Sequence, residues 1–210
     1  MIRRFLAGLM IGFLVVGNVT GRALGGDPAP LVKGTQPNQF NLVGLTPDSL
    51  TIEGGEVRLS GKPLGYFATR TSYRDFTLTF EYRFDRPADL KSDADFRGNS
   101  GLLLFLNGPP RVWPDCVQVQ LDQADPGAIF ALGGSTIESQ SNPIAQKAAV
   151  KPVGEWNKVK VISRGGTVVA ILNGVEVARG EKATPAQGPI AWQSEGKPVR
   201  FRQIQIQTEP

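Results

Sequence analysis

Apolar and polar residues alternate with a period of two through most of this sequence, and a helical period is almost absent. The stretch DFTLTFEYRF, residues 75–84, places its large apolar side chains on one face of an extended chain and its polar ones on the other. Successive side chains of a β-strand point to opposite faces, so this pattern predicts a strand with one buried face. The stretch from Trp156 to Gly180 continues the alternation, with Gly165-Gly166 and Asn173-Gly174 between its runs. Asn-Gly is the strongest short hairpin signal, and we therefore expect an antiparallel meander here.

Further short strands are expected at 56–59, 66–71, 101–106, 116–122, 128–132, 189–194 and 199–208. Many short strands between turn residues, without interleaved helices, predict an all-β fold of the antiparallel sandwich type. The segments 85–97 and 134–149 are expected to be loops, and either could cap a groove.

The N-terminus has the layout of a secretory signal. Arg3 and Arg4 precede an apolar run over 5–16, which is too short to span a bilayer comfortably. We expect residues 1–23, ending at Ala23, to be removed, 24–39 to form a flexible lead-in and 40–210 to form one domain. The mature protein is then secreted or periplasmic and has no membrane span.

Composition excludes several classes of function. The net charge of +4 includes Arg3, Arg4 and Arg22 of the expected signal, which leaves about +1 with the other cations scattered, so nucleic-acid binding is not indicated. There is no histidine, which excludes Ser-His-Asp and Cys-His nucleophilic sites and the usual zinc sites. The one cysteine, Cys116, lies in an alternating strand and is expected to be a buried thiol.

Polar side chains gather on one side of three expected strands. They are Glu81 and Arg83 on the first, Gln118, Gln120 and Asp122 on the second, and Gln193 and Glu195 on the third. If these sides belong to one sheet they form a polar floor, although the wet face of any antiparallel sheet gives the same pattern. Glutamine amides can donate and accept hydrogen bonds toward sugar hydroxyl groups at once. Trp113 or Trp192 could add a stacking surface, with a core role as the alternative.

Four segments together resemble a known family. They are RDFTLTFEYRF, GNSGLLLFLNGPPRVWPDCVQVQLDQ, VKPVGEWNKVKVISRGGTVVAILNGVEV and IAWQSEGKPVRFRQIQIQ. They resemble the 3-keto-disaccharide hydrolase domain family over roughly residues 40–208. The resemblance implies a concanavalin A-like jelly-roll β-sandwich of two antiparallel sheets, with ligand on the concave sheet. It also implies action on glycosides oxidised to a ketone at sugar carbon 3, often by secreted bacterial proteins.

The resemblance also points to particular residues. Those that match family motifs are Glu81, Arg83, Asn99 to Gly101, Gln120, Gln193, Glu195 and Arg202. The main departure is Gln118, which stands where the family usually has glutamate. An amide keeps the shape of the acid but cannot ionise, so Gln118 cannot serve as a general base.

The implied chemistry needs three roles. A ketone at carbon 3 acidifies the proton on carbon 2, so a base can remove it and the group on carbon 1 can leave by elimination, after which water adds. The hypothesis assigns Glu81 or Asp122 as the base, Arg83 or Arg202 as the group that holds the enolate, and Glu195 as the acid for the leaving oxygen.

The cofactor is left open. A divalent ion held by Asp122 and Asn99 could replace the arginine, but the sequence gives no ligand spacing that fixes such a site. The expected substrate-binding residues are Arg83, Asn99, Trp113, Gln118, Gln120, Gln193 and Arg202.

Two other functions compete with an enzyme of 3-keto-glycosides. One is a non-catalytic carbohydrate-binding module that kept the groove and lost the acid at Gln118. The other is an envelope scaffold that uses the sandwich for protein contacts. Fold alone does not separate them, because sandwiches of this kind host lectins and hydrolases alike.

Overall fold

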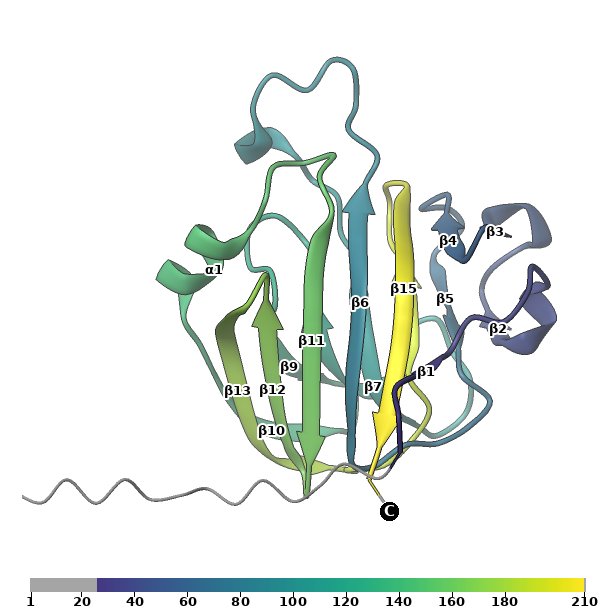
Figure 1. Cartoon of the computed structure of the whole chain (residues 1–210), viewed down its shortest axis with the longest axis vertical. Coiled ribbons are helices and arrows are strands. Elements are labelled where there is room, and N and C mark those ends of the chain that lie inside the picture. The colour runs from purple at the N-terminus through teal and green to yellow at the C-terminus, as the bar shows by residue number, and fades with distance from the viewer. Residues whose placement is uncertain (1–25, 210) are drawn as a thin grey trace, which may run out of the picture.

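Two antiparallel β-sheets pack face to face in the computed structural model, which describes residues 26–209 (Figure 1). In Figure 1 β11, β6 and β15 lie side by side in the front layer, and β5, β7 and β9 lie in the layer behind. The architecture confirms the predicted all-β jelly-roll sandwich.

The larger sheet has nine strands within the described residues. Their order in space is β10 (Thr136–Ser141), β13 (Val175–Thr184), β12 (Thr167–Leu172), β11 (Asn157–Arg164), β6 (Phe76–Phe84), β15 (Val199–Thr208), β4 (Glu56–Leu59) and β3 (Leu50–Glu53), and β1 (Ala29–Pro30) pairs with β15.

The smaller sheet has six strands in the same part of the chain. Their order is β2 (Asn41–Val43), β5 (Gly65–Ala68), β14 (Ala191–Ser194), β7 (Gly101–Asn107), β8 (Asp115–Gln120) and β9 (Ile129–Leu132). The helical elements are the helix α1 (Pro143–Ala149) and the 3-10 turns Pro37–Gln39, Pro47–Ser49 and Asp93–Asp95.

The core lies between the sheets and consists of the inward half of each alternating strand. Every second residue of β6 is buried, from Phe76 to Phe84. Trp192 of β14 stacks on Phe67 of β5 with ring centroids 5.2 Å apart, and Phe80 of β6 meets its edge. Trp192 is fully buried, so it is a core residue and offers no surface to a ligand.

The meander predicted from the glycine dipeptides is present as β11, β12 and β13. Asn173 and Gly174 have φ values of 49° and 91°, the left-handed conformation that a tight hairpin turn needs. Short turns of this kind fix the register of the strands, and register decides which side chains face the core.

The segment 134–149 differs from the expected loop, because it contains β10 and α1. Apart from Ile137, the residues of β10 are polar and mostly exposed, because this strand forms an edge of the sheet beside β13, so the sequence shows no alternation there. Asn142 caps the helix by accepting a 3.0 Å hydrogen bond from the Ala145 N–H group.

The packed part of the chain begins earlier than Phe40, where the sequence analysis places the start of the domain. β1 pairs with β15, and Leu31 donates a 2.9 Å backbone hydrogen bond to Ile204. The expected signal, residues 1–23, lies outside the described residues. Within 26–209 no helix is long and apolar enough to cross a membrane.

Candidate functional site

The polar side chains singled out in the sequence lie on two different faces of the molecule. β8 turns Val117 and Val119 into the core, so Gln118 lies on the outer face of the six-stranded sheet. β6 belongs to the nine-stranded sheet, and its polar residues, among them Glu81, lie on the outer face of that sheet. The expected single polar floor is therefore not formed, because its strands belong to different sheets.

On the six-stranded sheet, two glutamines meet across a glycine. A Cβ atom added to Gly101 would lie 2.8 Å from the side-chain carbon and nitrogen of the Gln118 amide and 3.0 Å from Gln193 Oε1. Gln118 is 3% exposed and Gln193 is 2% exposed. Ordinary solvation of a wet sheet face therefore does not account for these two amides.

The amides of β8 form a short relay that ends on a carboxylate. Gln118 Nε2 donates a 2.5 Å hydrogen bond to Gln120 Oε1, and Gln120 Nε2 donates a 3.1 Å hydrogen bond to Asp122 Oδ2. A carboxylate can only accept hydrogen bonds, so Asp122 fixes the orientation of the side-chain amides of Gln120 and Gln118.

Glu195 lies at the end of β14 beside Asn99. The backbone of Asn99 bridges to Glu195 and Gly196, which joins the segment before β7 to the turn after β14. Burial raises the pKa of the Glu195 carboxyl, and the charge of Asp122 raises it further, whereas a hydrogen bond from the Asn99 side chain opposes the rise. Asn99 lies two residues before Gly101, which pairs with Gln120 of β8, so Asp122 and Glu195 flank Asn99 from the two neighbouring strands.

Two buried acceptors at this site have no hydrogen-bond partner within the described chain. They are Gln193 Oε1 and Asn99 Oδ1. A buried acceptor left without a donor costs about 1–3 kcal/mol, which a ligand hydroxyl group would recover. Amide oxygen atoms can also coordinate hard cations. Within residues 26–209, however, no group of three His, Cys, Asp or Glu side chains could hold a metal ion.

Phe130 is a residue of this face that the sequence analysis missed. It lies directly opposite Gln118 in the pairing of β9 with β8, and it is 37% exposed. The sequence GAIFAL indicates its outward position, because Phe130 directly follows the inward residue Ile129 in an alternating strand. An exposed aromatic ring beside amides can stack against the apolar face of a sugar ring.

The outer face of the nine-stranded sheet carries a separate cluster. Arg202 Nε lies 2.6 Å from Glu81 Oε2, and the guanidinium groups of Arg202 and Arg83 lie 4.0 Å and 4.7 Å from the centre of the Trp156 ring. These cation–π contacts and the ion pair give Glu81, Arg83 and Arg202 partners of their own. The structure does not bring them together with Asp122 and Glu195.

Two other predicted residues lie away from the amides. Trp113 belongs to the segment between β7 and β8 and is 47% exposed. Cys116 is buried among Tyr66, Ala68, Leu103 and Ala191, and burial raises the pKa of its thiol to about 12. The prediction of a buried structural thiol is confirmed.

The site thus combines a buried amide floor, two acids and an exposed aromatic ring on one sheet of a jelly roll. The fold and the family model define the class as a carbohydrate-related β-sandwich domain. More narrowly, the chain belongs to the 3-keto-alpha-glucoside-1,2-lyase-like domain family, whose model matches residues 28–207. The resemblance inferred from the sequence motifs is confirmed.

Solved structures share the fold at low sequence identity. A candidate glycosyl hydrolase from Parabacteroides distasonis ATCC 8503 is 19% identical, with a TM-score of 0.65 over 87% of this chain and 100% of that one. The carbohydrate-binding module CBM66 from Bacillus subtilis is 13% identical, with a TM-score of 0.60 over 81% of this chain and 96% of its own. A Bacillus subtilis protein with a galectin-like fold is 10% identical, with a TM-score of 0.58 over 90% of this chain and 99% of its own. No curated protein matches the sequence.

Proposed function

We propose that the protein cleaves the glycosidic bond of 3-keto-glycosides on the outer face of the six-stranded sheet. The observation that carries the proposal is that Asp122 and Glu195 flank Asn99 at the end of a floor of buried amides. Family membership supports the choice of an oxidised glycoside over an ordinary one.

In the proposed reaction Asp122 acts as the base. Its carboxylate removes the proton from carbon 2, and the electron pair of that bond forms the carbon 1–carbon 2 double bond as the carbon 1–oxygen bond breaks. Glu195 gives its proton to the departing oxygen, a role for which a raised pKa suits a carboxyl group. Water then adds to carbon 1, giving its proton to Glu195, while protonated Asp122 returns its proton to carbon 2.

The remaining residues of the face would bind the oxidised sugar. The unpaired oxygens of Gln193 and Asn99 accept hydrogen bonds from its hydroxyl groups, and Phe130 stacks against its apolar side. Gln118 and Gln120 hold their places through the relay to Asp122, so they orient substrate and base together. No proton transfer is assigned to Gln118.

The test is turnover of 3-keto-trehalose and a 3-keto-β-glucoside by the purified protein, with and without added divalent ions. Asp122→Asn should lower kcat by about 10²–10⁴, the usual contribution of a positioned base. Asp48→Asn, at an exposed position away from the site, is the matched control and should keep full activity. Full activity of a folded Asp122→Asn protein would refute the mechanism.

A non-catalytic carbohydrate-binding module is the second function, and Gln118 in place of the family glutamate is the observation that favours it. It predicts binding of the same sugars in titration calorimetry without any turnover. If neither turnover nor binding is measured, the glycoside function is wrong.

We also propose that the protein is exported after removal of residues 1–23. The support is the arrangement of Arg3, Arg4 and the apolar run over 5–16. Mass spectrometry of the protein from cell fractions tests this: the expected N-terminus follows Ala23 in the exported fraction, and an intact Met1 in the cytosol would contradict it.

A further inference from the structure

Ser100 is a buried residue at the start of β7 to which the proposed reaction gives no role. Its side chain is 0% exposed. Its neighbours in the chain both belong to the site, because Asn99 contacts Glu195 and Gly101 leaves room for the amides. A serine hydroxyl group is a hydrogen-bonding group, and a buried one needs a partner. The partner of Ser100 lies on β14.

The hydroxyl group of Ser100 fills a gap in the ladder between β7 and β14. Within the described chain, regular pairing of the two strands ends at Leu102 of β7, and three residues farther along Asn99 bridges to Glu195 in the same register. In the gap, Ser100 Oγ donates a 2.7 Å hydrogen bond to the backbone carbonyl oxygen of Gln193. A side chain therefore holds β14 at the point where backbone pairing has stopped.

The backbone of Ser100 binds the neighbouring strand on the other side. Its carbonyl oxygen accepts a 2.9 Å hydrogen bond from the N–H group of Leu121, the residue before Asp122. Because Gly101 pairs with Gln120, this bond extends the contact between β7 and β8 by one residue toward the acid. Ser100 is thus bonded to the residue before the proposed base and, through its side chain, to β14 two residues before the proposed acid.

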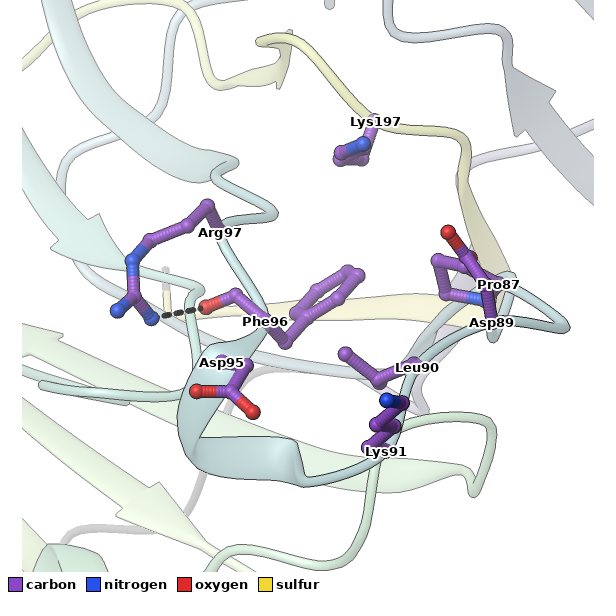
Figure 2. Close-up of a pocket in the computed structure, with 8 residues that line it drawn as sticks. All are labelled: Pro87, Asp89, Leu90, Lys91, Asp95, Phe96, Arg97 and Lys197. Carbon is purple, nitrogen blue, oxygen red and sulfur yellow. Dashed lines mark hydrogen bonds between the residues drawn. The ribbon is translucent and has the colours of Figure 1, made fainter.

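The chain on the N-terminal side of Ser100 is itself held in place. The Phe96 ring packs edge-on against Phe84 of β6, with ring centroids 5.1 Å apart. Arg97 Nη1 donates a 3.0 Å hydrogen bond to the carbonyl oxygen of Phe96, and Figure 2 shows this bond at the wall of a cavity of about 340 Å³. A hydroxyl group on such a packed segment can hold another strand at a set distance.

We propose that Ser100 is a positioning residue that sets the distance between the proposed base and the proposed acid. The inference rests on the proposed function. Asp122 and Glu195 follow the ends of β8 and β14, two strands that do not pair with each other, because β7 lies between them. Ser100 has a hydrogen bond to each of them. Catalysis depends on such distances, since a misplacement of about 1 Å can cost about 100-fold in rate.

The experiment removes only the hydroxyl group. Ser100→Ala keeps the backbone bond to Leu121 but leaves the Gln193 carbonyl oxygen without its donor, so the end of β14 should move and Glu195 should become more accessible to water. Turnover of 3-keto-trehalose should fall about tenfold or more. The alkaline limb of the pH–rate profile should shift to lower pH, because burial is what raises the pKa of Glu195. Wild-type turnover and an unshifted limb in the folded variant would overturn the proposal.

Ser163→Ala is the matched control. Ser163 of β11 is also 0% exposed, and its hydroxyl group donates a 2.6 Å hydrogen bond to the carbonyl oxygen of Arg74, on the other sheet. This variant loses the same kind of bond, so it should be destabilised like Ser100→Ala but keep the turnover and pH profile of the wild type. Ser100→Thr retains the hydroxyl group and should recover both. An equal loss in Ser163→Ala, or no recovery in Ser100→Thr, would overturn the positioning role.

A second measurement separates failure of this inference from failure of the proposed function. If the wild type does not cleave 3-keto-trehalose, the proposed function fails, and an NMR titration of the Glu195 carboxyl group in isotope-labelled protein decides the role of Ser100. A lower pKa of Glu195 in Ser100→Ala but not in Ser163→Ala would support it, together with shifted signals of residues 193–195 and an unshifted signal of Asp122. An unchanged pKa of Glu195 would overturn it.

Discussion

Gln118 is buried against Gln120, and its hydrogen bonds show what a carboxylate at this position would disturb. Its Nε2 donates to Gln120 Oε1, which is held in place because Gln120 Nε2 faces Asp122. A carboxylate in place of Gln118 would set two acceptors against each other, and a flipped Gln120 would point its oxygen at Asp122. The amide at 118 is therefore matched to the acid at 122.

Gln118→Glu should destabilise the protein at pH 7 by about 1–3 kcal/mol, the cost of buried acceptors without donors. Burial raises the pKa of the introduced carboxyl, so the folded state binds more protons than the unfolded state. The loss of stability is then complete when the pH is above the pKa that the new carboxyl group has in the folded state. It shrinks as the pH falls toward the lower pKa of the unfolded state, because the protonated acid donates a hydrogen bond to Gln120. Thermal melts at pH 7 and pH 5 measure this difference.

The control is Gln205→Glu, the same change at an exposed position of β15, which should melt like the wild type at both values of pH. If the Gln118→Glu protein had the same melting temperature as the wild type at pH 7, the relay would not constrain position 118.

Glu195 makes a prediction about the pH dependence of catalysis. Burial raises its pKa, so the protonated form persists above the usual carboxyl range, and activity should fall as the pH rises through that value. Glu195→Gln should lower kcat by about 10²–10⁴ and remove this alkaline limb from the pH–rate profile. A variant with the same alkaline limb would exclude Glu195 as the acid.

At the scale of elements, β7 is the strand that allows two glutamines to meet. Gly101 has no side chain at the point where Gln118 of β8 and Gln193 of β14 approach each other. Any Cβ atom there contacts both amides too closely, so the glycine belongs to the site as much as the glutamines do.

Gly101→Ala should displace the two amides and lower the affinity for a 3-keto-glycoside by about tenfold or more, the loss expected for one or two good hydrogen bonds. Titration calorimetry measures the affinity, and circular dichroism checks that the sheet remains folded. Gly134→Ala is the matched control, since an added Cβ there meets only ordinary contacts, the nearest at 3.6 Å. Full affinity in the Gly101→Ala protein would remove the amide pair from the binding site.

Individual strands were predictable from sequence because burial on one face imposes a period of two. The bounds of β4 and β15 match the expected ranges, and β6 differs by one residue. β10 was not predictable in this way, since Ile137 is its one residue packed against the core and a single inward residue sets no period.

Pairing between distant strands could not be derived from the same pattern. β6 pairs with β15, more than a hundred residues later, and neither pairs with β8. For this reason Glu81 and Gln118 were expected on one floor and lie on opposite faces, and outward Phe130 was overlooked. The residues that do gather, Asp122, Gln193 and Glu195, lie on β8 and β14 or just beyond their ends, on either side of β7.

At the scale of the whole molecule, the sandwich separates two polar clusters by its hydrophobic core. Packed sheets lie about 10 Å apart, so their outer faces are farther apart than any direct contact between side chains. One face carries the amides with Asp122 and Glu195, and the other carries Trp156 with its two arginines and Glu81. We expect the first face to perform the chemistry and the second to stabilise the fold.

Glu81→Gln tests this division of roles. The variant loses the 2.6 Å ion pair with Arg202, which stays against Trp156, so the free energy of unfolding should fall by no more than about 1 kcal/mol, as for other partly exposed pairs. Turnover of 3-keto-trehalose should equal that of the wild type, because Glu81 faces away from Asp122 and Glu195. Urea denaturation and kcat/KM measured on one preparation give both quantities. A folded variant that has lost turnover would return Glu81 to the role of base, and the division between the two faces would then be wrong.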